Sequence, residues 1–318
     1  MRSGIAIAGN ILVDKINKIS SYPPEGELTK INEISLAVGG CVPNVGIDLK
    51  KIDSSIPVYA LGCIGKDSEG EYALNVMKDN NLDVSMVRYT DKKTSFTDVM
   101  SVEGGQRTFF TYPGANSEFG ETDVDFDNLK ADMLHLGYFL LLDKIDAGEG
   151  EKILRLAKQK GISTSIDLVS ENSDRYRIVL PCLPYTDNLI INEVEAGNIT
   201  GISPTQDNLV VIAKKLKKLG VIDRVIIHTP SLSVCVSNTT ETLVSSYSLP
   251  QGFIKGTTGA GDAFCAGALL GIYRGWSDED ILSFASASAV ANLSQPDATS
   301  GMRSEDEIRE LVKNMHRQ

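Results

Sequence analysis

The sequence lacks long apolar runs and paired cysteines, and each shortage excludes a class of protein. Nowhere in the 318 residues do about 18 apolar residues follow one another, as a membrane-spanning helix requires. The apolar stretch near the N-terminus is too short for a secretory signal. The five cysteines are scattered and form no C-x-x-C pair, which argues against a disulfide framework or a zinc site. We therefore expect a cytoplasmic protein in a reducing compartment, with no membrane partner.

Positive charge is also scarce. The chain has 31 Lys and Arg against 42 Asp and Glu, a net charge of −11, which argues against nucleic acid or an anionic membrane as partner. Hydrophobic residues make up 42% and charged residues 23% of the chain, as in ordinary globular proteins. A chain of this length can form one large α/β unit, and we expect a single domain over residues 1–318.

Several common site signatures are missing. There is no G-x-x-x-x-G-K-[ST] loop, no G-x-S-x-G elbow and no H-E-x-x-H pair. A dinucleotide-binding G-x-G-x-x-G is absent too, because Phe264 stands where its third glycine would be. His135 and His228 fall within expected strands, which favours the core over catalysis for both.

Much of the chain alternates between strand and helix patterns. Such alternation indicates right-handed crossovers and a parallel sheet covered on both faces. Strands are expected at 4–9, 57–61, 132–136, 163–167, 188–192 and 224–228. Helices are expected from 43 to about 52 and at about 69–80, 149–160, 206–219, 262–274, 278–293 and 305–316.

Two segments depart from that alternation, at about 15–38 and 94–112. The first has a loosely alternating, exposed strand pattern from Lys30 to Val38, and the second reads as a hairpin through Gly104-Gly105. Neither is followed by a crossover helix. The two segments would form a small β-sheet lid over a site, or an ordinary extra sheet at the edge of the domain.

The most informative stretch is Gly-Thr-Thr-Gly-Ala-Gly-Asp-Ala-Phe at residues 256–264. Its small residues let the backbone approach a ligand and turn into a helix whose first N–H groups attract an anion. Asp262 would repel a resting anion, but it could accept a proton from a hydroxyl that attacks a phosphoryl group. The alternative is a tight loop in which Asp262 only caps the helix.

With Gly267 three residues further on, this stretch resembles the C-terminal signature of the ribokinase-like (PfkB) family of sugar and nucleoside kinases. Gly39, Gly40 and Asn44 resemble the N-terminal Gly-Gly-x-x-x-Asn motif of the same family. The resemblance covers nearly the whole chain. It implies an α/β, ribokinase-like three-layer fold with a mainly parallel central sheet and a small β lid. It also implies transfer of a phosphoryl group from ATP, with Mg²⁺, to an alcohol group of a small sugar or sugar-like polyol.

The resemblance also implies roles for individual residues. Asp262 would be the base, and the backbone N–H groups of Gly259, Ala260 and Gly261 would form the anion hole. The substrate would be held by Asp14, Gly39, Gly40, Asn44 and Asn116. The nucleotide would contact Asn192, Thr229, Thr257, Gly259 and Gly261. Asn192 and Glu195 match an Asn-x-x-Glu motif associated with magnesium, bound here through water; a helix cap with a solvated face is the alternative.

The chain departs from the family pattern at several positions. Cys41 stands where ribokinases typically carry Lys, which argues against ribose. Gly256 and Asp297 replace a usual Asp and a frequent Gly in two loops that hold a monovalent cation in ribokinase-like members. One hypothesis is that Asp297 supplies the missing carboxylate. Pro230 lies where the family tends to have a Gly-x-x-Gly turn beside the nucleotide, and it removes a backbone donor.

Two other functions fit the residues. A nucleoside kinase with the same machinery would need an apolar seat for the base, which aromatic residues of the lid could provide; these are Phe96, Phe109, Phe110 and Tyr112. A non-catalytic sugar-binding regulator would keep the fold without turnover, and the retained Asp262 argues against it. An exposed lid sheet would also suit a homodimer.

Overall fold

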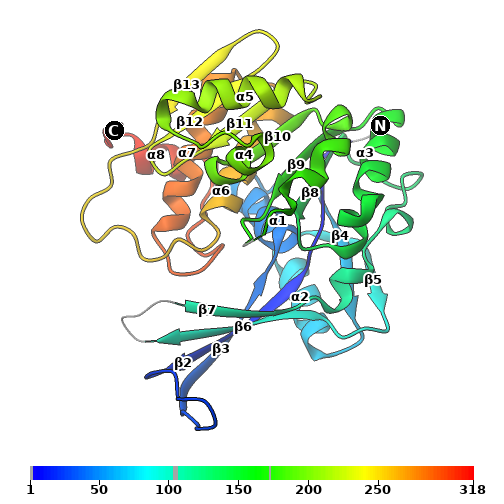
Figure 1. Ribbon diagram of the computed structural model, residues 1–318, viewed down its shortest axis with the longest axis vertical. Coiled ribbons are helices and arrows are strands. Elements are labelled where there is room, and N and C mark those ends of the chain that lie inside the picture. Colours follow the sequence, from blue (N-terminus) through cyan, green and yellow to red (C-terminus); the bar gives the residue numbers. More distant parts are fainter. Residues whose placement is uncertain (1–2, 103–106, 172) are drawn as a thin grey trace.

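The computed structural model describes residues 3–102, 107–171 and 173–318, and the expected α/β fold is confirmed. In this part of the chain a nine-stranded sheet has the order β13-β12-β11-β10-β9-β8-β1-β4-β5, and a four-stranded sheet has the order β3-β2-β6-β7 (Figure 1). The large sheet comprises β1 (Ile5–Ala8), β4 (Val58–Gly65), β5 (Asp83–Thr90), β8 (Met133–Phe139), β9 (Ser163–Leu168), β10 (Asn188–Asn192), β11 (Arg224–His228), β12 (Leu232–Val236) and β13 (Glu241–Ser245).

The large sheet is mainly parallel, as expected. β1 lies at its centre, where Ile5 pairs with Val58 of β4 on one side and with Met133 of β8 on the other. The pairs β11–β12 and β12–β13 at one end are antiparallel. Because the other strands are parallel, the carboxyl ends of β1, β8, β9 and β10 meet at one edge of the sheet, where ligands collect in such folds.

Helices cover both faces of the large sheet and make the three layers. Ile5 and Ile7 point into a core formed with one group of helices, whereas Ala6 and Ala8 point into a second core on the opposite face. The first face carries α1 (Cys41–Ile52), α2 (Ser68–Asp79), α6 (Ala260–Tyr273), α7 (Asp278–Leu293) and α8 (Glu305–Val312). The second carries α3 (Gly150–Gln159), α4 (Glu193–Thr200), α5 (Leu209–Lys218) and the 3₁₀ segment Arg175–Tyr185.

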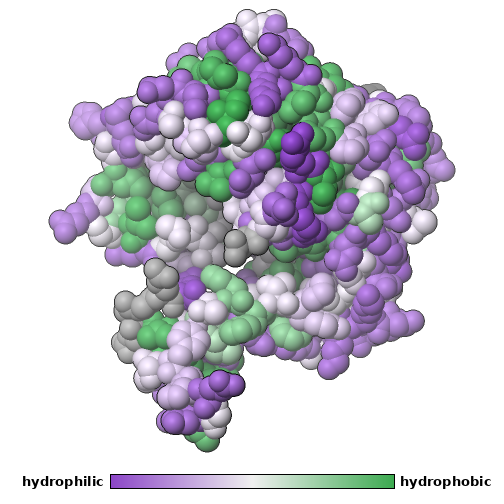
Figure 2. Space-filling model, in the orientation of Figure 1, coloured by the Kyte–Doolittle hydropathy of each residue, from purple (hydrophilic) through white to green (hydrophobic). Residues whose placement is uncertain are grey.

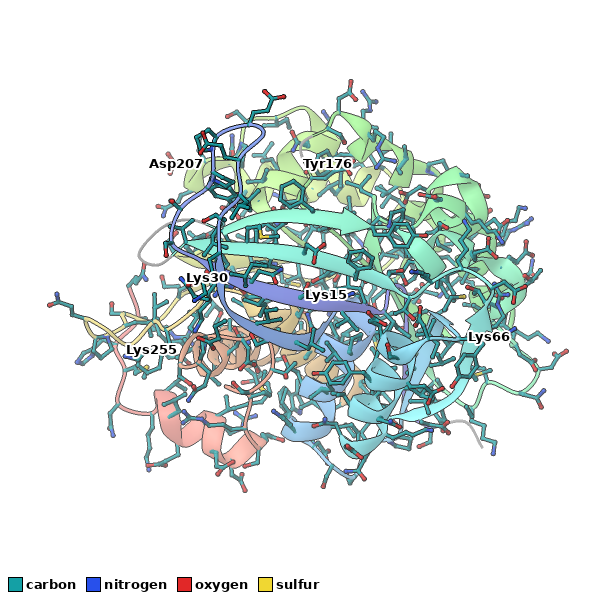
Figure 3. The ribbon with its side chains drawn as sticks, turned by 90° about the horizontal axis from the view of Figure 1, so that it is seen from below. Lys15, Lys30, Lys66, Tyr176, Asp207 and Lys255 are labelled. Atoms are coloured by element: carbon teal, nitrogen blue, oxygen red, sulfur yellow. The ribbon has the colours of Figure 1, made fainter. Side chains whose placement is uncertain are left out.

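The small sheet is built from the two segments that interrupt the alternation. Its strands are β2 (Leu12–Ile19), β3 (Ile31–Gly39), β6 (Ser95–Val102) and β7 (Arg107–Tyr112). β6 and β7 form the expected antiparallel pair; Gly104-Gly105 between them lie outside the described residues. Figure 2 shows this lid projecting from the body, and Figure 3 shows its strands, with Lys15 on β2, from below.

Some elements differ from the sequence expectation. β5, β12 and β13 were not expected. β5 and β13 are the two edge strands of the large sheet, where exposed polar residues interrupt the apolar run, whereas β12 lies next to the edge and is mostly buried. β2 begins at Leu12, so Asp14 lies within a strand of the lid, slightly before the expected start of the lid segment at about 15. In the described part of the chain, no helix has the length and apolar character needed to cross a membrane.

Candidate active site

The N-terminus of α6 lies at the strand edge described above. Gly259 precedes this helix with a left-handed backbone, φ 78°, and a Cβ there would lie 2.6 Å from the Cα of Ala298. Only glycine fits that combination of φ and close packing. The first-turn N–H groups, including that of Gly261, have no acceptor within the helix. Gly261 lines both cavities described below, whereas the Ala260 N–H donates to the carbonyl of Thr257 at 3.3 Å.

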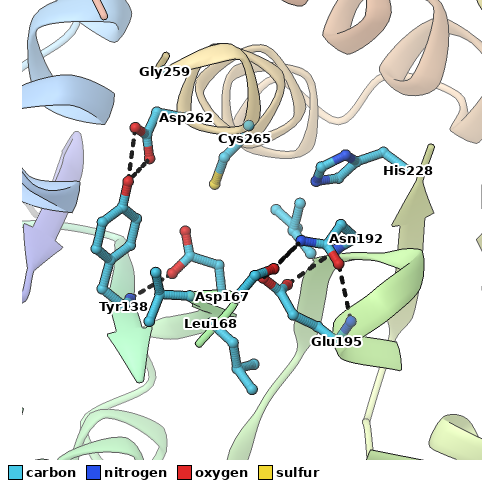
Figure 4. A pocket seen from close by; sticks show the side chains of 13 residues that line it. Tyr138, Asp167, Leu168, Asn192, Glu195, His228, Gly259, Asp262 and Cys265 are labelled. Atoms are coloured by element: carbon cyan, nitrogen blue, oxygen red, sulfur yellow. Dashed lines mark hydrogen bonds between the residues drawn. The ribbon is translucent and has the colours of Figure 1, made fainter. Parts of the chain in front are cut away.

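Asp262, in the first turn of α6, is buried and hydrogen-bonded from two sides. Figure 4 shows the bonds to Tyr138. The Asn44 side-chain amide of α1 donates to its Oδ2 at 2.9 Å. The Tyr138 hydroxyl, from β8, lies 2.9 Å from each carboxylate oxygen. Burial, reinforced by the nearby negative charge of Asp167, raises the pKa of Asp262 from 3.8 to about 7. This carboxylate can therefore exchange a proton near neutral pH.

The N-terminus of α1 brings Gly40 and Asn44 to the same place. Gly40 precedes the helix with φ 99°, and a Cβ there would lie 2.6 Å from the carbonyl oxygen of Asn10. Asn10 caps this turn, because its Oδ1 accepts the N–H of Cys41 at 2.8 Å. The Oδ1 of Asn44 is buried and has no hydrogen-bond partner among the described residues. That oxygen is available to a ligand hydroxyl.

Asp14, in β2, and Asn116, which follows the lid, differ in how their side chains are held. Asp14 packs against Gly39, where an added Cβ would lie 2.6 Å from its Oδ2. Burial raises the pKa of Asp14 to about 6, against the lowering effect of Arg107. Asn116 is buried, and its Oδ1 already accepts the N–H of Ile11 at 3.0 Å. Its side-chain oxygen therefore ties the start of the lid to the body.

Two adjoining cavities meet at α6. The smaller, of about 180 Å³, is lined by Tyr138, Asp167, Glu195, Asp262 and Cys265 among others. The larger, of about 670 Å³, has a mostly apolar wall that includes Leu249, Ile254, Phe264, Val290 and Leu293. Asn192, His228 and Gly261 line both. A polar chamber joined to an apolar one suits a ligand with an anionic end and a flat apolar end.

The residues expected to contact a nucleotide border the larger cavity. Thr229, Pro230 and Thr257 line it together with Ala260. The Thr229 hydroxyl, however, is engaged in its own turn, where it donates to the carbonyl of Leu232 at 3.0 Å. The centroid of the His228 ring lies 4.6 Å from that of the Phe264 ring. Burial lowers the pKa of His228 to about 4, so the ring that lines both cavities is neutral.

Asn192 and Glu195 form a capping box at the start of α4. The Glu195 N–H donates to Asn192 Oδ1 at 2.9 Å, and the Asn192 N–H donates to Glu195 Oε2 at 3.1 Å. Ser170 also donates to Glu195 Oε1 at 2.9 Å. Burial raises the pKa of Glu195 to about 8. The helix cap is therefore present in the structure, and the same two side chains also face the smaller cavity.

Asp297 carries hydrogen bonds of its own. Its Oδ1 accepts the N–H of Thr299 at 3.0 Å and that of Ser300 at 2.8 Å, and its Oδ2 accepts the Ser300 hydroxyl at 2.5 Å. Gly256 packs against Pro296, the residue before Asp297, since a Cβ on Gly256 would lie 2.7 Å from the carbonyl oxygen of Pro296. The two loops are thus in contact, with the Asp297 carboxylate turned into its own loop.

Three residues at the site were not singled out from the sequence as site residues. Tyr138 and Asp167 line the smaller cavity, and Arg107 of β7 donates to the Thr258 hydroxyl at 3.0 Å. Asp167 is the last residue of the expected strand 163–167, and Tyr138 lies two residues after the expected strand 132–136, so the rule that ligands collect at strand carboxyl ends could have identified them. Arg107 gave no such signal, because its contact depends on how the lid closes over α6.

Comparison with known proteins agrees with this geometry. The model of the family described as "pfkB family carbohydrate kinase" matches residues 5–305. A ribokinase of Arabidopsis thaliana is 25% identical over 313 residues, covering 97% of this chain and 81% of the relative. A 5-dehydro-2-deoxygluconokinase of Clostridium beijerinckii is 23% identical and covers 96% of this chain and 91% of the relative. The structure of Arabidopsis thaliana ribokinase complexed with ribose and ATP superposes with a TM-score of 0.86 at 24% identity, covering 98% of this chain and 99% of that one.

Proposed function

The chain belongs to the PfkB family of carbohydrate kinases, and on that premise we propose that Asp262 is the base in phosphoryl transfer from ATP to an alcohol group of a small sugar or sugar-like polyol. The observation that carries the proposal is the environment of Asp262. It is a buried carboxylate with a pKa raised to about 7 by burial, at the N-terminus of a glycine-flanked helix. A base of that pKa is suited to neutral pH.

The chemical step is a displacement at phosphorus. The sugar oxygen attacks the γ-phosphorus of ATP, the bond to the β–γ bridging oxygen breaks, and ADP leaves with that electron pair. Asp262 takes the proton of the attacking hydroxyl. The N–H groups of Gly259, Ala260 and Gly261 would stabilise the charge on the transferring group, since the helix N-terminus is positive.

The substrate would lie between the lid and α1. Asp14, Gly39, Gly40 and Asn44 would border this space, and Asn116 would brace the lid against the body through its bond to Ile11. The free Oδ1 of Asn44 supports a polyol, because it can accept a hydroxyl hydrogen while the amide group of the same side chain holds Asp262. Closure of the lid would exclude water and so suppress hydrolysis of ATP. We further propose that the chain works as one domain, with the lid formed by about 15–38 and 94–112.

ATP would occupy both cavities. The apolar wall of the larger one suits adenine, with Thr229 and Thr257 beside it, and the phosphates would point to Gly259 and Gly261. Asn192 and Glu195 offer the oxygen atoms that Mg²⁺ prefers. Both Glu195 oxygens already accept hydrogen bonds, so they fit contact through water. When bound, Mg²⁺ would neutralise charge on the phosphates.

Three further expectations belong to this proposal. A monovalent cation would be held by the loops of Gly256 and Asp297, and replacing potassium with a bulky organic cation would then slow turnover. The chain would act in the cytoplasm. It would form a homodimer through the lid, which exposes Ile34 at 65% and Phe109 at 60%; molar mass in solution tests this pairing.

The first test is ADP release with Mg²⁺ and ATP across sugars, sugar acids, sugar phosphates and nucleosides, with Asp262→Asn beside the native chain. We expect turnover with one sugar class, reduced roughly 10²- to 10⁴-fold in the variant. Exposed Asp83→Asn is the matched control. Equal rates in Asp262→Asn and the native chain would refute the assignment of the base. A nucleoside signal would change the substrate class, with the Phe96 and Tyr112 rings, 5.3 Å apart, as its seat.

A further inference from the structure

Four side chains that can bind a metal ion lie close to one another in the interior near Asp262. Cys41 begins α1, His135 lies on β8, Asp167 lies on β9, and Cys265 lies on α6. All four are buried, with at most 7% of the residue exposed. The sequence argued against a zinc site because the cysteines are scattered; the fold brings two of them together with a histidine and a carboxylate.

The distances define a compact group of three side chains with Cys265 beside it. Among the described residues, ligand atoms of Cys41, His135 and Asp167 all lie within 4.8 Å of one another, whereas Cys265 falls outside this mutual group and adjoins it at His135. His135 Nε2 is 3.4 Å from Asp167 Oδ2 and 3.6 Å from Cys265 Sγ. A tetrahedral zinc centre with usual bond lengths has edges of about 3.3 Å between nitrogen and oxygen and about 3.6 Å between nitrogen and sulfur. The two edges measured at His135 match these lengths.

Hydrogen bonding accounts for only part of this arrangement. The other ring nitrogen of His135, Nδ1, lies 2.9 Å from the Ser165 hydroxyl. Nε2 carries either one hydrogen or one lone pair, yet it faces both a carboxylate oxygen and a thiol. One hydrogen bond can satisfy one of these neighbours, whereas a metal ion would bind all of them.

We propose that Cys41, His135 and Asp167 form a binding site for a divalent cation of the zinc class, and that Cys265, next to His135, turns toward the bound ion as its fourth ligand. Thiolate and imidazole ligands select zinc and similar ions over magnesium. Binding releases two thiol protons, so the two positive charges that enter are balanced and the net charge of the group does not change. In the metal-free protein, burial raises the pKa of both Cys41 and Cys265, which keeps them as neutral thiols.

The surroundings complete a site of this kind. Ser165 fixes the orientation of the His135 ring, and the Tyr138 N–H donates to Asp167 Oδ1 at 2.6 Å, which leaves Oδ2 facing His135. Gly137 has no Cβ, and an added one would collide with Cys41 Sγ. Asp167 and Cys265 line the smaller cavity, which gives an ion an entry path (Figure 4). This inference does not depend on which substrate the kinase takes.

Cobalt(II) binding to the full chain tests the proposal. The reduced, chelator-treated protein is titrated with Co²⁺, which reports thiolate ligands through sulfur-to-cobalt charge-transfer absorption. We expect that absorption to saturate at one ion per chain, to be displaced by Zn²⁺ but not by Mg²⁺, and to accompany a rise in melting temperature. Absence of the charge-transfer absorption in the native chain would overturn the proposal.

Variants assign the ligands. Cys265→Ser and Cys41→Ser should each weaken the absorption, and Ser165→Ala should lower affinity roughly 10- to 100-fold as a neighbour of a ligand. The matched controls are Cys182→Ser and Cys235→Ser, which are also buried but lie elsewhere. Controls that lose the absorption as fully as Cys41→Ser and Cys265→Ser would contradict the assignment. If a ligand variant does not fold, the titration of the native chain and the controls still decides.

Discussion

The Tyr138 hydroxyl lies 2.9 Å from both carboxylate oxygens of Asp262, although 124 residues separate the two in the chain. The backbone of Tyr138 is held as well, because its N–H donates to Asp167 at 2.6 Å and its φ is 59°, in the left-handed region. A tyrosine in that region is strained and needs support from its surroundings. The carboxylate that we propose as base is thus oriented before a sugar arrives.

Tyr138→Phe should move the pH dependence of the reaction. The native rate is expected to rise as Asp262 ionises, through a pKa of about 7. The tyrosine hydroxyl stabilises the ionised carboxylate, so its loss should raise that pKa and shift the acid limb of kcat/KM to higher pH. The measurement is kcat/KM from pH 5 to 9, with Tyr59→Phe, away from the site, as control. A rate lowered equally at every pH would contradict this role.

Gly259→Ala should reduce both stability and turnover. The left-handed backbone costs a side chain about 1–2 kcal/mol, and the new Cβ would also press on Ala298 at 2.6 Å. Gly252→Ala is a close control, because Gly252 has the same φ of 78° with nothing within 4 Å. Urea unfolding should show a smaller loss for Gly252→Ala, with kcat retained. Equal losses in the two variants would mean that the packing against Ala298 contributes nothing.

Stability should fall as pH rises through the neutral range. Burial raises the pKa of Glu195 from 4.5 to about 8, so the native state holds a proton that the unfolded chain releases near pH 4.5. The contribution of this bound proton to the free energy of unfolding is complete at low pH and is lost as pH rises from about 4.5 to about 8. In the variant Glu195→Gln, the free energy of unfolding should vary less between pH 5 and 8. Urea titrations at several pH values measure this, and an unchanged slope would count against a buried, protonated Glu195.

The contact between Arg107 and Thr258 should help to close the lid. Arg107 donates to the Thr258 hydroxyl at 3.0 Å, so Thr258→Val removes the acceptor while Thr258→Ser keeps it. Because this hydrogen bond is exposed, we expect its loss in Thr258→Val to raise the KM for the sugar roughly 2- to 10-fold. Steady-state kinetics with the two variants provide the comparison. If valine and serine behave alike, the hydroxyl does not hold the lid.

Local patterns predicted the interior of the fold better than its margins. The expected strands at 132–136 and 188–192 are centred on apolar residues because both of their faces are buried, and they agree with β8 and β10 within a few residues. β5 and β13 carry exposed polar residues at the ends of the sheet and gave no clear pattern. The place of Asp14 in β2 was not predicted, because nothing local shows that the chain leaves the large sheet and enters the lid at Leu12.

The sequence by itself determined what depends on neighbouring residues. Gly259, Gly261 and Asp262 lie within one helical turn, so their spacing alone predicts donors and a carboxylate at one point. Only the tertiary structure decided that Asn44, 218 residues away, and Tyr138 would hold that carboxylate. The same holds for Cys41, His135, Asp167 and Cys265, which meet because four elements pack at one sheet edge. Contacts between distant residues depend on how strands and helices pack, and spacing along the chain carries no record of that.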